Sequence, residues 1–301
     1  MKTILITGGS GLIGSKLSLA LIAKGYQVKH LSRQPIHHAL IKSYSWDIEN
    51  NSIDENAFEG VDAIIHLAGA GIADKKWTVK RKAEIVNSRV NSTQLLFDYV
   101  QKMSLPLETF IAASATGIYP NNPHKIYNEN AKPATDFLGD CCEKWENKID
   151  LFTTMGIRTI KLRTGIVLSK EGGALPKMAK PILAGIGAPI GNGKQWMSWI
   201  DEDDLVNMYI FALENKSLNG AYNAVSPHPC SNQNFTNVLA KILNRYIFLP
   251  KIPSFVIRLL LGEMSIIVLA STKVSAEKII ATGFKFNFEK LSESLTKIYH
   301  E

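Results

Sequence analysis

The chain has 301 residues and a mass of 33.3 kDa; 46% of its residues are hydrophobic and 20% are charged. This composition excludes a disordered chain, a collagen-like chain and a multi-span membrane protein. Lysine and arginine number 34 and aspartate and glutamate 27, so the formal net charge is +7. Such an excess favours anionic partners, but it does not distinguish nucleic acid from a phosphorylated small molecule.

The three cysteines are too few for a disulfide framework, and Cys141 and Cys142 are adjacent. We therefore expect reduced thiols in a cytoplasmic protein. Neither this cysteine pair nor His37 and His38 have the spacing of a metal site, so no metal is expected.

The most apolar late stretch, residues 255–270, is interrupted by Arg258, Gly262 and Glu263. These interruptions favour a buried helix pair over a segment that spans a membrane. The sequence therefore predicts no membrane partner.

Short apolar runs alternate with amphipathic segments along the first half of the chain. Strands are predicted at residues 3–7, 26–31, 44–46, 61–67, 107–113 and 157–162. Helices are predicted at residues 12–24, 56–58, 78–103 and 139–154. This alternation predicts an α/β fold with a Rossmann-type, doubly wound parallel sheet.

The second half has a different texture. Residues 172–193 are rich in glycine and proline without a steady period, and a helix capped by Asp203 or Asp204 is predicted up to residue 214. A strand at 220–225 and a helix at 234–244 follow, and prolines and apolar helices from residue 249 onward indicate a smaller, α-rich C-terminal lobe. We predict two domains: residues 1–165 with about 201–225 bind the nucleotide, and residues 166–200 and 226–301 form a substrate lobe.

The first predicted turn carries a dinucleotide-binding motif, G-x-G-x-x-G, between a strand and a helix. Glycines permit a tight turn and the approach of backbone amides to a pyrophosphate, which the helix N-terminus attracts. The predicted cofactor-binding residues here are Gly8, Gly9, Ser10, Gly11, Leu12, Ile13 and Gly14.

The end of the second strand indicates the type of cofactor. NAD-binding sites usually place an acidic residue there for the ribose 2′-hydroxyl, whereas this chain has Ser32 and Arg33 and no acid before Asp47. A guanidinium and a hydroxyl suit a 2′-phosphate, so NADP(H) is favoured over NAD(H). Arg33 as a solvated loop charge is the weaker alternative. Asp47 either lies under the adenine or serves as a turn residue.

Several segments resemble the short-chain dehydrogenase/reductase superfamily in its extended form. They are residues 7–14, 66–69, 191–195 and 199–205. In that superfamily the fourth-strand motif lies beside the cofactor, so the resemblance implies that Leu67, Ala68 and Gly69 contact it.

A narrower resemblance is to the atypical, YfcH-like subgroup of NAD(P)-dependent epimerase-family proteins. It rests on residues 67–73, 87–90, 114–119 and 195–199. Residues 259–264 resemble the core of that subgroup's C-terminal DUF1731 segment, which would occupy residues 249–298. The resemblance implies epimerase-like chemistry on a bound nicotinamide cofactor.

The superfamily's usual proton-transfer pair is absent. A Tyr-x-x-x-Lys spacing places both side chains on one helix face, where the lysine lowers the pKa of the tyrosine. None of the nine tyrosines has a lysine four residues later, and the positions that the resemblance assigns to the pair hold Phe137 and Cys141. Ordinary tyrosine-driven hydride transfer is therefore not supported by the sequence.

Three residues are candidates for the missing chemistry. Ser114 stands where the resemblance places a hydroxyl, although anchoring the alignment on Tyr119 puts Ala115 there instead. Tyr119 either faces the nicotinamide pocket, as our first candidate for proton donor, or packs at its turn. Arg89 replaces the usual asparagine and would bind an anionic substrate.

We predict an NADP-binding oxidoreductase or nucleotide-sugar-epimerase-like protein acting on a small carbonyl or hydroxyl substrate, anionic or nucleotide-linked. The alternative is a catalytically silent NADP(H)-binding sensor or interaction protein. Nucleic acid is disfavoured, because the basic run 75–82 is better explained as a solvated helix start beside an anionic cofactor. Extended members are often dimers, so the resemblance is compatible with a homodimer.

Overall fold

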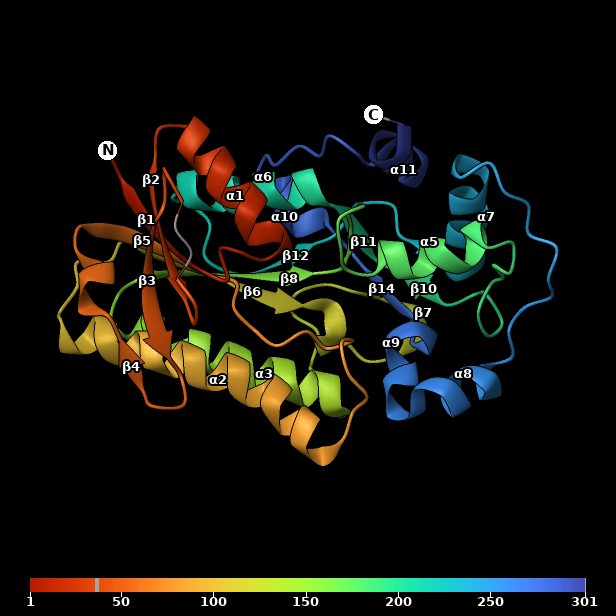
Figure 1. Cartoon of the computed structure of the whole chain (residues 1–301), viewed down its shortest axis with the longest axis horizontal. Coiled ribbons are helices and arrows are strands. Elements are labelled where there is room, and N and C mark those ends of the chain that lie inside the picture. The colour runs from red at the N-terminus through yellow and green to blue at the C-terminus, as the bar shows by residue number, and fades with distance from the viewer. Residues whose placement is uncertain (36–37, 301) are drawn as a thin grey trace.

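A computed structural model describes residues 1–35 and 38–300, and its centre is an eight-stranded sheet (Figure 1). The strand order is β12-β8-β6-β5-β1-β2-β3-β4, and neighbouring strands are parallel except β3 and β4. The strands are β1 (Thr3–Thr7), β2 (Gln27–Ser32), β3 (Lys42–Asp47), β4 (Ser52–Ile53), β5 (Val61–His66), β6 (Thr109–Ala115), β8 (Arg158–Thr164) and β12 (Gly220–Ala224). The expected doubly wound parallel sheet is confirmed.

The central strands are buried on both faces. All five residues of β1 are buried, and in β5 only Asp62 is partly exposed. Continuous aliphatic and β-branched runs suit such strands. From β1 the chain proceeds to β2 and β3 on one side, and later fills β5, β6 and β8 on the other. Doubly wound folds bind their ligands at the carboxyl ends of the strands beside such a reversal.

Helices cover both faces of the sheet (Figure 1). Helices α1 (Leu12–Ala23) and α6 (Glu202–Glu214) lie on one face, and α2 (Val79–Lys102) and α3 (Phe137–Ile149) lie on the other. Each pair encloses its own cluster of buried apolar side chains against the sheet. The predicted helix at 139–154 is two helices, because α3 ends before Asp150 and the short α4 (Leu151–Thr154) follows.

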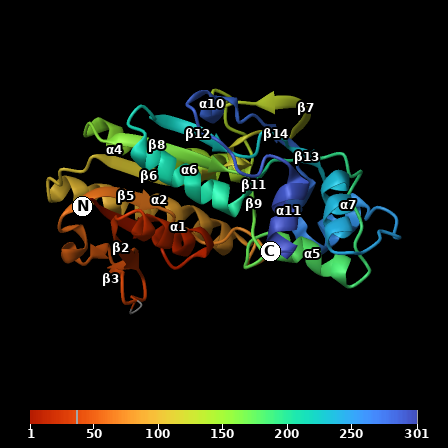
Figure 2. The ribbon, with the colours of Figure 1, turned by 90° about the horizontal axis from the view of Figure 1, so that it is seen from above.

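Many of the remaining elements extend the molecule beyond one end of the sheet, where α5, α7 and α11 lie together (Figure 2). A third cluster of buried side chains, which includes Leu175, Trp199, Phe235 and Leu295, holds this lobe together. The elements are η1 (Glu55–Phe58), η2 (Thr116–Ile118), β7 (Asn122–Tyr127), β9 (Ile166–Leu168), α5 (Leu175–Leu183), β10 (Trp196–Met197), β11 (Trp199–Asp201), β13 (Cys230–Ser231), α7 (Asn232–Ile242), α8 (Ser254–Leu261), η3 (Gly262–Ser265), α9 (Ile266–Leu269), β14 (Thr272–Val274), α10 (Glu277–Ala281) and α11 (Leu291–His300).

The helix predicted before residue 214 is confirmed, but its cap is Asp201 rather than Asp203 or Asp204. The carboxylate of Asp201 accepts the backbone N–H of Asp203 at 2.9 Å. Asp204 is buried and accepts the N–H groups of Asn287 and Phe288 at 2.8 and 3.0 Å. Propensity favours aspartate at a helix start, and the tertiary contacts decide which one caps.

The segment 172–193, rich in glycine and proline, contains α5, whose buried face is formed by Leu175, Ala179 and Ile182. One expectation about the lobe is wrong. The stretch 255–270 is not a buried helix pair, because α8 buries only Ile257. No helix among residues 1–35 and 38–300 is long and apolar enough to cross a membrane.

Candidate cofactor and active site

The glycine loop between β1 and α1 packs too closely for larger side chains. Gly8 has a φ of +69°, and a Cβ there would lie 3.0 Å from the backbone of Leu67 and Ala68. A Cβ on Gly14 would overlap the carbonyl oxygen of Gly8 and lie 2.7 Å from the Cα of Gly9. Glycine at these positions therefore keeps the loop close to β5 and α1 close to the loop.

Helix α1 begins inside this loop at Leu12. Its N-cap, Gly11, has no side chain to accept the N–H groups of the first turn. These N–H groups have no acceptor within the helix, and the helix dipole gives this end a partial positive charge. Residues 8–14 thus have the geometry of loops that bind a dinucleotide pyrophosphate, and their contact with a cofactor stays a prediction.

His30 is not among the predicted site residues, but its side chain packs against the glycine loop. A Cβ on Gly9 would overlap its imidazole ring. Its Nε2 lies 2.7 Å from the Ser18 hydroxyl, which donates to the carbonyl of Gly14, also at 2.7 Å. Burial, and secondarily the nearby His38, lower the pKa of His30 to about 4. The ring is therefore uncharged at neutral pH, and its packing against the loop helps to fix the position of the loop.

The end of β2 presents the side chains predicted to choose the cofactor. Ser32 Oγ donates to the carbonyl of Gln34 at 2.9 Å, and Arg33 is exposed. The Asp47 carboxylate accepts the N–H groups of Glu49 and Asn50 and the Asn50 side-chain amide. Hydrogen bonds from Asn50 lower the pKa of the Asp47 carboxyl. Asp47 thus holds its own turn, and a contact between Asp47 and adenine stays a prediction.

The segment after β5 lies beside the glycine loop. The N–H of Leu67 donates to the Thr7 carbonyl at 3.1 Å, and the N–H of Ala68 lies 3.2 Å from the Thr7 hydroxyl. A Cβ on Gly69 would lie 3.2 Å from the guanidinium of Arg89. The fold therefore brings the predicted residues 8–14, 67–69 and Arg89 into one neighbourhood.

Arg89 reaches this neighbourhood from α2. One of its terminal nitrogens donates to the carbonyls of Ala70 and Ile85 at 3.0 and 2.9 Å, and the guanidinium carbon lies 5.2 Å from the centre of the Trp145 ring. Burial lowers the pKa of Arg89, and the nearby thiol of Cys141 acts more weakly in the opposite direction. The side chain remains a cation, held under the loop that follows β5.

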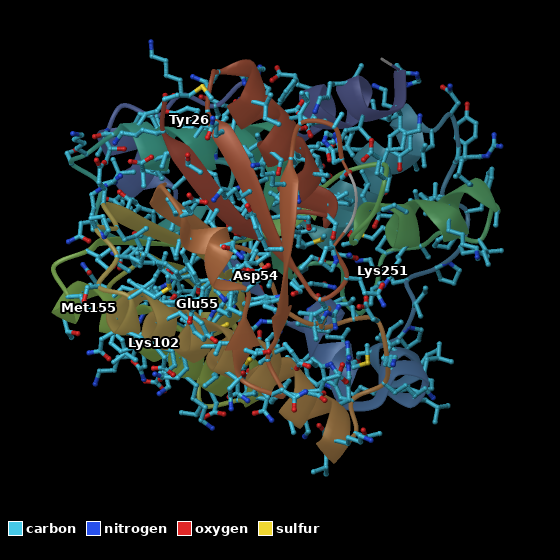
Figure 3. The ribbon with its side chains drawn as sticks, turned by 60° about the vertical axis from the view of Figure 1, so that its left-hand side comes forward. Tyr26, Asp54, Glu55, Lys102, Met155 and Lys251 are labelled. Atoms are coloured by element: carbon cyan, nitrogen blue, oxygen red, sulfur yellow. The ribbon has the colours of Figure 1, made fainter. Side chains whose placement is uncertain are left out.

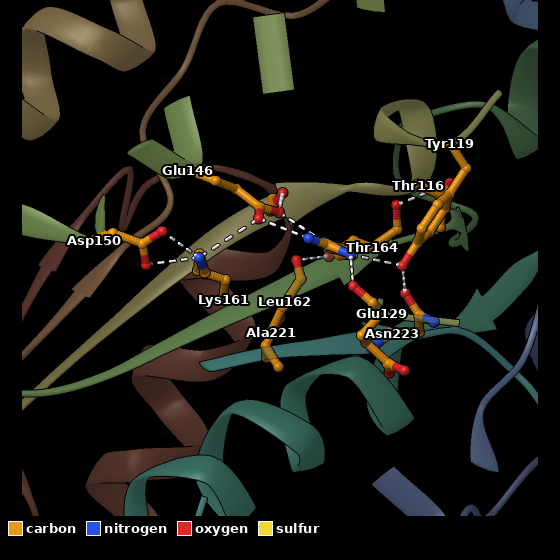
Figure 4. A network of polar contacts seen from close by, with 12 residues as sticks. Thr116, Tyr119, Glu129, Glu146, Asp150, Lys161, Leu162, Thr164, Ala221 and Asn223 are labelled. Atoms are coloured by element: carbon orange, nitrogen blue, oxygen red, sulfur yellow. Dashed lines mark hydrogen bonds and ion pairs between the residues drawn. The ribbon is translucent and has the colours of Figure 1, made fainter. Parts of the chain in front are cut away.

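Ser114, at the carboxyl end of β6, joins a buried polar network around Glu146, and Figure 4 shows this network. The Ser114 hydroxyl donates to Glu146 Oε1 at 2.6 Å. Arg163 donates to both carboxylate oxygens of Glu146 at 2.8 Å, and Glu146 and Arg163 are 5% and 7% exposed. Burial raises the pKa of Glu146, but the bonds from Arg163 and Ser114 outweigh burial, so the net shift of the pKa is downward. Glu146 is therefore ionised at neutral pH and fixes the orientation of the Ser114 hydroxyl.

Tyr119 belongs to the same network. Its hydroxyl donates to Asn223 Oδ1 at 2.5 Å and accepts from Arg163 at 3.0 Å (Figure 4). Burial raises the pKa of Tyr119 to about 12, against the opposing influence of Arg163. The network continues from Glu146 to Lys161 at 3.6 Å and from Lys161 to Asp150 at 2.6 Å, where Asp150 is half exposed.

Sequence reasoning missed Glu146 and Arg163. On the helix that carries Glu146, Asp140 and Lys144 form an exposed ion pair at 2.8 Å. Glu146 follows Cys142 by four residues and lies on the buried face of α3. The four-residue spacing from Cys142 was the feature of the sequence that could have indicated a buried Glu146.

The positions that resemble the missing tyrosine and lysine are filled by apolar contacts. Phe137 packs edge-to-face against Trp77, with ring centroids 4.8 Å apart. Cys141 is buried, and burial raises its pKa, so its thiol stays protonated. Among the residues that the structure describes, no group of His, Cys, Asp and Glu is placed to hold a metal ion.

A pocket lies at the opposite, amino-terminal end of β5, and Glu55, Phe58, Met103 and Pro106 are among the residues that line it. Glu55 forms an ion pair with Lys102, and Figure 3 labels both residues. The pocket is separate from the glycine loop, which lies at the carboxyl ends of the strands.

The model of the NAD-dependent epimerase/dehydratase family matches residues 4–224, and that of DUF1731, a domain of unknown function, matches residues 252–298. The chain belongs to the NAD-dependent epimerase/dehydratase family. An epimerase family protein of Staphylococcus saprophyticus is 37% identical over the whole length of both chains. One from Mycobacterium leprae is 34% identical over 97% of this chain and 94% of its own. The predicted resemblance, including the DUF1731 segment, is confirmed.

Solved structures of epimerase-family proteins share this fold. Human epimerase family protein SDR39U1 (isoform 2), solved with NADPH, has a TM-score of 0.89 at 29% identity over 99% of each chain. A UDP-glucuronic acid 4-epimerase from Bacillus cereus, solved with UDP-glucuronic acid and NAD, has a TM-score of 0.81 at 20% identity over 99% and 98%. The latter likeness concerns the fold alone. Family membership thus implies a nicotinamide dinucleotide and leaves its type open.

Proposed function

We propose that this epimerase-family protein binds NADP(H) and exchanges a hydride with a small carbonyl or hydroxyl compound. One observation carries the cofactor choice: β2 ends in Ser32 and an exposed Arg33, with no acidic residue before Asp47. A guanidinium and a hydroxyl recognise a 2′-phosphate, whereas NAD sites present a carboxylate to the 2′-hydroxyl. The NADPH bound to the human relative is in keeping with this choice.

The glycine loop would hold the pyrophosphate at the start of α1, and residues 67–69 would lie along the cofactor. When bound, the nicotinamide ring supplies or accepts the hydride. Ser114, held by the ionised Glu146, would accept a hydrogen bond from a substrate hydroxyl, and the Arg89 cation would attract an anionic group. Tyr119 is our candidate for the residue that gives or takes the proton. The lobe formed by residues 166–200 and 226–301 would enclose the substrate.

A second candidate function is cofactor binding without turnover. Two observations favour it: the Tyr-x-x-x-Lys pair is absent, and the hydroxyl of Tyr119 is already bonded to Asn223 and Arg163 while burial raises its pKa to about 12. A tyrosine with such a pKa is a poor proton donor at neutral pH. A sensor of this kind would bind NADPH tightly and oxidise none of it.

The cofactor proposal is tested by titrating NADPH and NADH into the wild type and the Arg33→Ala variant. Hydrogen bonds to a charged group contribute about 1.5–3 kcal/mol, so we expect NADPH to bind roughly 10–150-fold more weakly and NADH to bind unchanged. Lys42→Ala removes an exposed cation from the other end of the neighbouring strand β3 and serves as the control. Equal weakening of both cofactors by Arg33→Ala would refute the 2′-phosphate assignment.

Catalysis is tested by following NADPH absorbance with a panel of aldehydes, ketones and keto sugars. Turnover by the wild type that is lost in Ser114→Ala and in Tyr119→Phe supports the roles assigned to the two hydroxyls. Full turnover by Tyr119→Phe excludes Tyr119 as the donor. Tight NADPH binding with no oxidation across the panel favours the second candidate.

A further inference from the structure

Two segments of the lobe carry an excess of positive charge. Residues 172–200 and 226–262 contain seven lysines and arginines and no aspartate or glutamate. The whole chain has 34 cations and 27 acids, so the remaining residues contain 27 of each and are neutral. The entire formal charge of +7 therefore belongs to these two lobe segments, and all seven cationic side chains are exposed.

The same segments expose large apolar side chains. Tyr246 is 79% exposed, Phe248 80%, Phe255 67%, Leu259 83% and Leu260 61%. Isolated exposed apolar residues are ordinary, whereas groups of them on a protein surface mark sites of interaction. Two such groups lie in residues 245–251 and on the outer face of α8, and we call the two together the lobe surface.

The loop of this surface is fixed to the rest of the lobe. The Arg245 side chain donates to the carbonyl of Leu183, at the end of α5, at 3.4 Å. Lys251, labelled in Figure 3, donates to the carbonyl of Asn192 at 2.9 Å. The rings of Tyr246 and Phe248 lie 5.9 Å apart. The apolar side chains and the cations are therefore presented by the same anchored segment.

Helix α8 repeats this combination. Phe255, Arg258 and Leu259 stand at positions i, i+3 and i+4, which share one face of a helix, and all three are exposed. Ile257 is the one buried residue of the helix. An arginine thus lies beside two apolar side chains on an exposed face of the helix. In Figure 1, α8 and the loop that leads to it lie at the same end of the molecule, beyond the sheet.

We propose that the lobe surface docks on an anionic lipid membrane. Aromatic and aliphatic side chains that protrude beside lysine and arginine suit such a surface, because the apolar groups enter the headgroup region and the cations meet lipid phosphates. The expected absence of a membrane partner rested on a buried helix pair at 255–270, which the structure does not contain. No membrane-spanning segment is required.

A second copy of the chain fits this surface less well. A two-fold interface brings a patch against itself. Arg245, Lys251 and Arg258 would then face the same three cations, and residues 226–262 offer no carboxylate to pair with them. An anionic lipid membrane can contact both the cations and the exposed apolar side chains favourably. The proposal goes beyond the proposed function, because the lobe surface shares no residue with the glycine loop.

The test is flotation of the full-length protein with phosphatidylcholine vesicles, alone or containing about 30% phosphatidylglycerol. We expect binding to the anionic vesicles at low salt, and at least tenfold weaker binding to neutral vesicles or in about 0.5 M salt, because salt screens the attraction. Phe248→Ser with Leu259→Ser, and separately Lys251→Glu with Arg258→Glu, should each reduce the bound fraction at least tenfold. These four side chains are exposed, so both variants should fold and bind NADPH as the wild type does.

Matched controls separate the surface from general charge and hydropathy. Val79→Ser with Ile126→Ser removes apolar side chains that are 84% and 58% exposed elsewhere. Lys132→Glu with Lys285→Glu reverses two exposed cations outside the charged segments. Both control variants should float with anionic vesicles as the wild type does.

A direct readout comes from Phe248→Trp, since none of the five native tryptophans lies in residues 245–261. Its emission should shift to the blue on anionic vesicles and be quenched by lipids brominated near the headgroup. The proposal is overturned if the wild type does not float at low salt, or if the control variants lose binding as the lobe-surface variants do. It is also overturned if sedimentation shows a dimer that the lobe-surface variants dissociate, because a second copy would then cover the surface.

Discussion

The buried ion pair of Glu146 and Arg163 gives the sharpest prediction about stability. Glu146→Gln keeps the shape of the side chain and removes its charge. Arg163 would then remain 7% exposed without its carboxylate, whereas Lys161, 3.6 Å from Glu146 in the native protein, would keep its ion pair with Asp150 at 2.6 Å. Removing one partner of a buried ion pair costs about 3–5 kcal/mol of unfolding free energy.

The measurement is urea unfolding followed by circular dichroism. With a slope of about 3 kcal/mol per molar, the midpoint should fall by roughly 1–1.7 M. The control is Asp140→Asn on the same helix, which breaks an ion pair with Lys144 in which both side chains are about half exposed. Such a pair contributes no more than about 1 kcal/mol, so the control should shift the midpoint by at most roughly 0.3 M.

The pH dependence supplies a second check. The folded state lowers the pKa of Glu146, so its contribution is fully present above the ordinary glutamate pKa and is lost as pH falls below it. The difference between the wild type and Glu146→Gln should therefore shrink below about pH 4.3. A double replacement, Glu146→Leu with Arg163→Met, should recover part of the loss because no buried charge remains. A shift for Glu146→Gln no larger than that for Asp140→Asn would refute the reasoning.

Three other perturbations have defined outcomes. Gly14→Ala should weaken NADPH binding at least tenfold in a titration, since its Cβ would overlap the Gly8 carbonyl oxygen. The control Gly172→Ala, whose Cβ would lie 3.5 Å from its nearest neighbour, should leave the affinity unchanged. Unchanged affinity in Gly14→Ala would contradict the packing argument. His66 is fully buried and its pKa is lowered to about 3, so the stability it contributes is lost as pH falls below about 6.5. It should account for about 2 kcal/mol of unfolding free energy between pH 6.5 and pH 5, and a His66→Gln variant with the same pH slope as the wild type would exclude this source. Arg158 donates to four carbonyls at and after the end of α6, so Arg158→Met should lower the unfolding free energy measured in urea by about 1.5–3 kcal/mol. Arg158→Lys lacks the planar guanidinium and should not restore that stability. Full restoration by lysine would show that charge alone suffices.

The nucleotide-binding half was predictable because its signals are local. The run at 3–7 followed by glycines marks a buried strand and a tight turn, since glycine adopts the +69° φ of Gly8 without strain and has no Cβ to overlap at Gly14. Thr78 caps α2, whose predicted limits of 78–103 differ by one residue at each end from the observed ones. Each of these depends on neighbours in the sequence.

The candidate site was predictable only in part. Ser114, Tyr119 and Arg89 were chosen from a resemblance, and their partners come from distant segments: Ser114 meets Glu146, Arg89 meets Ala70, and Tyr119 meets Asn223, which is 104 residues away. No local pattern encodes such contacts. The same limit explains why Asp201, rather than Asp203 or Asp204, caps α6.

The sequence by itself determined the family, the sheet and the place of the glycine loop, because strand burial, helix period and turn geometry are properties of short segments. It also determined the net charge of +7. Only the tertiary structure decided where that charge and the apolar residues of 245–260 are presented, and which carboxylate and guanidinium are buried together. Burial and electrostatic pairing depend on which segments the fold brings into contact, and hydropathy along the chain does not specify that.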